Sequence, residues 1–146
     1  MMKVWAFIHP QLNTLCCALL PEAVPSNVEY VELEVETLDD VIYDGTQIRL
    51  KTEEEKLMEE KQKKLAELKN YVASLLRPTD YVVIRIAEAQ ALRNRRIAKQ
   101  LRQKYATQLQ QRQMIRQWNE QMKQTIRNTE TLEELKNILI DFQKEV

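Results

Sequence analysis

The residues of this sequence that could do chemistry are few, and their spacing does not assemble a catalytic or metal site. His9 is the only histidine, and no cysteine or carboxylate lies at a ligand spacing from it. Cys16 and Cys17 are adjacent, which is poor geometry for a disulfide between them and the wrong spacing for a zinc knuckle. We predict that they are two small apolar residues of a protein in a reducing compartment.

Two further patterns that enzymes use are missing or have a simpler structural explanation. Gly45 is the only glycine, whereas phosphate-cradling loops of the P-loop and dinucleotide-binding types need several glycines. Glu32, Glu34 and Glu36 alternate along the chain, and such a row is more typical of an exposed strand face than of paired catalytic carboxylates. We therefore predict that the protein is not an enzyme and has no catalytic residue, metal ion or cofactor.

Basic side chains give the sequence one set of candidate phosphate contacts. They lie between residues 93 and 116 and are Arg93, Arg95, Arg96, Lys99, Arg102, Arg112 and Arg116. Binding of nucleic acid through them would depend steeply on salt, because each phosphate contact releases counterions. The basic residues are spread around the predicted helix, and no motif of the usual RNA- or DNA-binding modules is present. A nucleic-acid-binding accessory protein is therefore the alternative hypothesis, and solvation of a long helix is the simpler explanation.

An apolar heptad register runs through the same part of the chain. The residues that carry it are Ile97, Leu101, Ile115, Trp118 and Met122. Lys104, Gln108 and Gln111 fill the register positions between them, and a helix this polar holds its shape poorly without a partner. We interpret the five apolar residues as partner-binding or oligomerisation positions of a coiled coil. The alternative is that this segment folds back on its own domain.

The helices that would position these residues can be outlined from caps and breaks. A first helix begins at the capping box Thr52–Glu55 and ends before Pro78, because the residue before a proline is pushed out of the helical region. A second helix is expected over residues 81–127, where neither proline nor glycine occurs. Together these two helices would form a helical hairpin over residues 52–127, in which the second helix is long, basic and rich in glutamine. A short helix follows within 128–146.

The first 51 residues are predicted to form a small antiparallel β domain. Lys3–Ile8 has the composition of a strand, and Thr14–Leu20 can return beside it. Residues 31–36 alternate between apolar and acidic side chains, as a strand with one exposed face does. Asp44-Gly45 indicates a two-residue hairpin turn. The predicted fold class is therefore α+β, with the β domain followed by the helical hairpin and the short C-terminal helix.

Charge is balanced over the 146 residues but strongly segregated along the chain. The 22 basic and 22 acidic side chains divide into a block of −9 over residues 1–60, +12 over 61–127 and −3 over 128–146. Such blocks influence the choice of partner more than the total does. No apolar stretch approaches the roughly 18–20 residues that cross a bilayer, and His9 and Pro10 interrupt the N-terminal run that a secretory signal would need.

In their order, these features resemble short tail-associated proteins of bacteriophages. The matching residues are the opening MKVWAFIHPQLN, the hairpin motif Tyr43-Asp44-Gly45 and the turn Thr79–Arg85 with the sequence TDYVVIR. The resemblance covers about residues 1–90 and brings no catalytic residue with it. It implies a structural or adaptor component of the tail or fibre, or its assembly factor. The implied partners are other tail or fibre proteins and further copies of the chain, in the virion tail or in the host cytoplasm during assembly.

Overall fold

The structure is a computed structural model that describes residues 1–142 and confirms the predicted α+β class. The chain divides into two compact units, a β unit that ends at Lys56 and a helical unit that begins at Leu57.

A three-stranded antiparallel sheet organises the β unit. Strand β1 (Met2–Ile8) lies in the middle and pairs with β2 (Leu15–Ala18) on one side and β3 (Tyr30–Val35) on the other. The alternation predicted for β3 is present, because Val35 is buried while Glu32 is exposed and forms an ion pair with the Lys3 side chain of β1. The acidic side chains of β3 therefore point to solvent.

The core of the β unit is small and aliphatic. Two short 3-10 helices, η1 (Pro21–Ala23) and η2 (Leu38–Asp40), connect its strands. The buried residues that form one apolar cluster are Val4, Ala6, Val35 and Val41. Because the last of these lies outside the three-stranded sheet, the cluster joins that sheet to the rest of the unit.

A separate hairpin, rather than a continuation of the sheet, follows η2. It pairs β4 (Val41–Tyr43) with β5 (Ile48–Leu50), and a backbone hydrogen bond from Asp44 to Gln47 closes the loop. The two turn residues therefore lie between that pair, one position later than predicted. Gly45 is the first of them and takes a φ of +90°, a conformation that suits glycine.

Asp44 gives this hairpin a predictable pH dependence. The amides of Gln47 and Thr46 donate to its carboxylate, and with the Arg49 guanidinium they lower the pKa of Asp44 from 3.8 to about 2. Because the folded pKa is depressed, the carboxylate stabilises the fold above about pH 4, and this contribution is lost as the pH falls towards 2. We expect Asp44→Asn to unfold at a lower temperature than the wild type at neutral pH, and the difference to shrink near pH 2.

The matched control is Asp39→Asn, because the Asp39 side chain forms no hydrogen bond or ion pair within residues 1–142. Its melting temperature should follow that of the wild type across the same pH range. A carboxyl NMR titration that places the pKa of Asp44 at its ordinary value would contradict the role of this turn.

The first long helix starts where the sequence predicts. In the capping box before α1 (Glu53–Leu76), the Glu55 amide donates to Thr52 Oγ1, and the Thr52 amide donates to Glu55 Oε1, both at 3.2 Å. The helix ends just before a 3-10 turn, η3 (Arg77–Thr79), which contains the predicted helix-ending proline. Helix α2 (Asp80–Ala91) begins directly after this turn.

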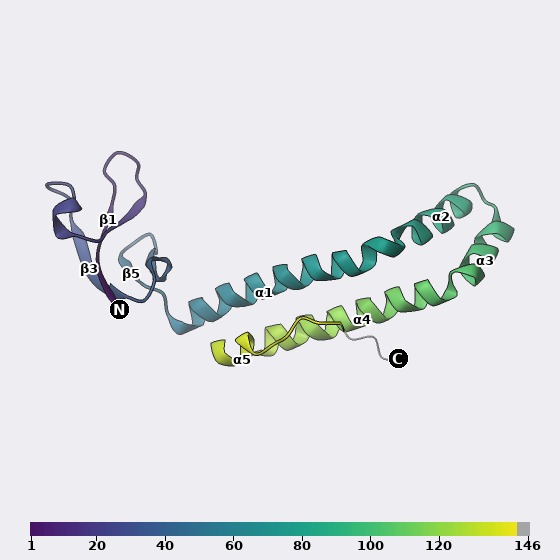
Figure 1. The fold of residues 1–146 in the computed structure, drawn as a ribbon. Helices are drawn as coiled ribbons and strands as arrows, with labels where there is room; N and C mark the ends of the chain where they lie inside the picture. Colours follow the sequence, from purple (N-terminus) through teal and green to yellow (C-terminus); the bar gives the residue numbers. More distant parts are fainter. Residues whose placement is uncertain (143–146) are drawn as a thin grey trace. The chain divides into compact units, whose positions relative to one another are not determined.

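The prediction of a single helix over residues 81–127 is wrong. The chain forms α2, then α3 (Arg95–Lys104) and α4 (Ala106–Asn128), and it reverses direction between Ala91 and Arg95 (Figure 1). The reversal is a Schellman turn, in which the Asn94 amide bonds to the Ala89 carbonyl and the Arg93 amide to the Gln90 carbonyl. Arg93 takes a φ of +56°, and the Asn94 side chain accepts from the Ile97 amide and caps α3.

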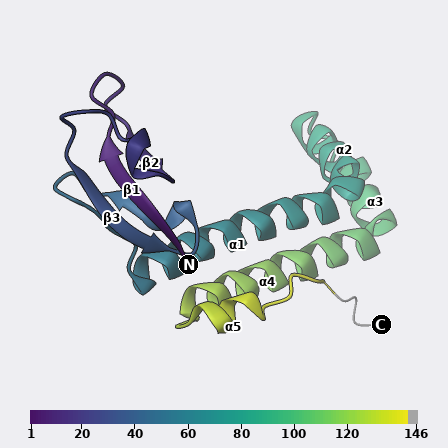
Figure 2. The same ribbon diagram turned by 60° about the vertical axis from the view of Figure 1, so that its left-hand side comes forward.

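Two apolar clusters hold the helical unit together. The larger consists of the buried residues Leu68 and Val72 of α1, Ile115 and Ile126 of α4 and Leu135 of the short helix that follows α4. The smaller joins Val82 and Ile86 of α2 to Tyr105, the residue between α3 and α4. In both views α1 and α2 run beside α4 and α3, as two antiparallel arms of one hairpin (Figures 1 and 2).

The C-terminal segment contains a shorter helix than its apolar pattern suggests. Helix α5 (Leu132–Lys136) is capped by Thr131, and the chain after it lies along α4 without helical structure as far as Phe142 (Figure 2). The Phe142 amide donates to the Tyr71 hydroxyl at 3.0 Å, and the Trp118 ring lies edge-on to both aromatic rings. Residues 143–146 of the predicted C-terminal helix lie outside the described residues.

Candidate functional site

The histidine and the two cysteines, which the sequence analysis considered and rejected as site residues, have structural roles or surroundings in the fold. His9 Nδ1 accepts hydrogen bonds from the amides of Gln11 and Leu12, so this ring nitrogen stabilises the turn after β1. Cys16 and Cys17 are free thiols, and burial raises the pKa of Cys17, which disfavours its reactive thiolate form. Within residues 1–142, no three histidine, cysteine or acidic side chains gather as a metal site would require. No described helix is long and apolar enough to cross a membrane.

Four of the five heptad residues are packed within the chain, and the interpretation of these four as a partner surface is corrected accordingly. Ile115 is 2% exposed, and Trp118 and Met122 pack against the same large cluster. Leu101 packs against the smaller cluster around Tyr105. The segment therefore folds back on its own unit, which was the alternative explanation. Ile97 is the exception, because it is 43% exposed near the hairpin turn.

Arg112 is the one predicted phosphate contact that is buried, and it serves the fold. Its Nη1 donates to the Leu76 carbonyl at 2.8 Å, to Thr79 Oγ1 at 2.9 Å and to Asp80 Oδ1 at 3.0 Å. All three acceptors lie where α1 gives way to α2. Arg112 of α4 therefore clamps the irregular turn of the opposite arm, and it is not available to a phosphate group.

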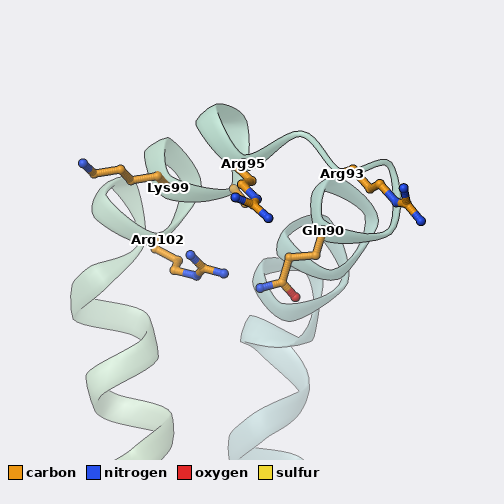
Figure 3. A pocket seen from close by; sticks show the side chains of 6 residues that line it. Gln90, Arg93, Arg95, Lys99 and Arg102 are labelled. Carbon is orange, nitrogen blue, oxygen red and sulfur yellow. The ribbon is translucent and has the colours of Figure 1, made fainter.

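Four of the remaining cations come together at the hairpin turn. They line a hollow of about 670 Å³ between α2 and α3, and its lining residues are Gln90, Arg93, Arg95, Ala98, Lys99 and Arg102. Figure 3 shows Gln90, Arg95 and Arg102 turned into the space between the two helices, with Arg93 and Lys99 extending to either side. Arg96 and Arg116 are exposed but do not line the hollow. We call the hollow with its six lining residues, from Gln90 to Arg102, the tip hollow.

A second surface feature is an apolar face that sequence reasoning missed. Most residues of α2 are apolar, and they lie on more than one side of the helix, together with the charged residues Asp80, Arg85 and Glu88. Only the side with Val82 and Ile86 is buried. Ile84 on the opposite side is 57% exposed, Val83 on the flank between the two sides is 40% exposed, and Leu92 just beyond the helix is 81% exposed. We call the exposed side, with Val83, Ile84, Ala87 and Ala91, the outer face of α2.

The outer face of α2 could have been found from the sequence pattern. The apolar residues between Tyr81 and Ala91 occupy more than one side of a helix, and a two-armed hairpin supplies only one neighbour. The remaining side is exposed and is a candidate contact surface for another molecule. Searches for similar proteins found no family model, no curated protein and no solved structure that matches this chain.

Proposed function

We propose that this protein is a non-enzymatic bacteriophage tail protein that acts by docking onto other proteins. It is either a structural or adaptor component of the tail or fibre, or the assembly factor of these parts. Its partners are tail or fibre proteins and further copies of the chain, in the virion tail or in the host cytoplasm during assembly. The resemblance of residues 1–90 to tail-associated proteins supports the phage assignment.

The observation that carries the docking function is the outer face of α2. Val83 and Ile84 are both exposed, and Ile84 lies on the side of the helix opposite Val82 and Ile86, which are buried. Burying a side chain of this size contributes about 1.5–3 kcal/mol, so a few such residues can anchor a partner. The heptad register is already used inside the hairpin, so this face takes over the role of the docking surface.

The decisive measurement is binding to the products of the genes that neighbour the gene of this chain, among which we expect tail or fibre proteins. Each is co-purified with the wild-type protein, and the complex is weighed by light scattering. We expect a stable complex, and we expect Ile84→Glu to weaken it at least about tenfold, because the partner would then bury an unpaired carboxylate. Circular dichroism should be unchanged, since Ile84 is more than half exposed in the free chain.

Leu139→Glu provides the matched control. It places the same charge on another exposed aliphatic residue, far along the chain from α2, and Leu139 is 77% exposed. We expect this variant to bind like the wild type. Equal losses in the two variants, or a wild-type monomer that binds none of the neighbouring gene products, would refute the proposed docking function.

A further inference from the structure

The positive charge at the hairpin turn has no acidic ion-pair partner among the described residues of the helical unit. Between Glu88 and Glu120 the sequence contains eight basic residues and no acidic one. The four cations of the tip hollow are exposed, and none of them forms an ion pair with a described residue. Arg112, the buried member of this stretch, is the one that does. The tip hollow therefore concentrates positive potential that an external anion can neutralise.

The spacing of the cations on α3 brings like charges together. Arg95, Lys99 and Arg102 follow one another at intervals of four and three residues, so they share one side of the helix. Like charges at this spacing destabilise an isolated helix, and the positive end of the helix dipole near Arg95 adds to the same potential. A bound anion would offset both the repulsion between these like charges and the positive potential at the start of the helix. The geometry thus favours occupancy by a ligand of negative charge.

The lining identifies the chemical class of that ligand. Guanidinium groups bind phosphate oxygens through two parallel hydrogen bonds, and the Gln90 amide can add a neutral donor. The described lining contains no aromatic ring on which a base could stack, and Ala98 is its only apolar residue. From Arg95 to Lys99 to Arg102 the helix rises about 10 Å, enough to follow more than one phosphate group.

We propose that the tip hollow is a binding site for a polyanion with successive phosphate groups. Two sources share this chemistry, namely a short inorganic polyphosphate and the backbone of a nucleic acid, which would be bound without regard to sequence. The site uses four basic residues near the hairpin turn in place of the seven phosphate contacts expected from the sequence. The tip hollow shares no residue with the outer face of α2, so the two proposals can be tested independently of each other.

The test uses two probes on the full chain, tripolyphosphate by calorimetry and a labelled oligothymidylate by fluorescence anisotropy. With four phosphate contacts, the logarithm of the oligonucleotide affinity should fall with the logarithm of the salt concentration at a slope of about −3. The double variant Arg95→Gln/Arg102→Gln should lower affinity for the bound probe at least about tenfold and roughly halve the slope. Lys99→Gln alone should reduce the slope by about one.

The matched control removes two exposed cations of α4, in Arg116→Gln/Arg127→Gln. This control variant carries the same change in net charge, and we expect its affinity for the bound probe to differ from that of the wild type by less than about twofold. Binding of tripolyphosphate alone would identify a small polyanion, and binding of the oligonucleotide alone would identify nucleic acid. The proposal is overturned if neither probe binds, or if the control weakens binding as much as the hollow variants do. Sedimentation with phosphatidylserine vesicles adds a third measurement, and binding to the vesicles alone would overturn the proposal as well, because the tip would then bind a lipid surface.

Discussion

Replacing Ile115 by alanine should lower the free energy of unfolding by about 3 kcal/mol, whereas Ile97→Ala should change it by less than about 0.5 kcal/mol. Ile115 is 2% exposed and packs in the large cluster between α1 and α4, so its truncation leaves a cavity. Ile97 makes no such contact, and alanine has the higher helix propensity. Urea unfolding followed by circular dichroism measures both losses.

The pair of variants separates two arrangements that use the same residues. Both isoleucines belong to the heptad register, so an intermolecular coiled coil would bury both and lose stability in both variants. In the hairpin only Ile115 is in the core. Losses of similar size at the two positions would therefore contradict the hairpin, and a large loss confined to Ile115 supports it.

Arg112→Met should lower the free energy of unfolding by about 2–3 kcal/mol, although methionine keeps most of the apolar stem of the side chain. Arg112 Nη1 donates to Leu76, Thr79 and Asp80, and its loss leaves these acceptors without the buried donor. The Asp80 side chain is half exposed, so water replaces part of that bond, and most of the loss comes from the other two. Thermal or urea unfolding of the purified variant gives the value.

Arg116→Met is the comparison for this substitution, because the Arg116 side chain is exposed. We expect it to change stability by less than about 0.5 kcal/mol. Arg112→Lys should recover part of the loss, since an ammonium group retains the charge and donors but not the reach of the guanidinium. If the two methionine variants are equally stable, the clamp between α4 and the opposite arm contributes nothing.

Much of the fold could be predicted from local signals. The capping box at Thr52, the strand pattern around Glu32 and the helix end before Pro78 each depend on residues close in sequence, and the structure confirms them. The hairpin turn could not be predicted by searching for glycine or proline, because Arg93 occupies the left-handed position where glycine is usual. Asn94 was the available signal, since asparagine is a preferred N-cap.

The candidate site was harder to predict, for two physical reasons. Apolar residues at heptad spacing look the same whether they face a second chain or the other arm of one hairpin, so Ile115 was assigned to the wrong partner. Basic residues likewise carry no mark of burial in the sequence. Arg112 was grouped with Arg95, although the first is enclosed by hydrogen-bond acceptors and the second lines an open hollow.

The aromatic cluster around Trp118 makes the helical unit observable by fluorescence on its own. The sequence contains two tryptophans, and each compact unit has one, with Trp5 in β1 and Trp118 in α4. In a Trp5→Phe protein, the emission would come from the indole that lies against Tyr71 and Phe142. Release of the C-terminal segment would then change the emission before the helices unfold, which gives the hairpin a native optical probe.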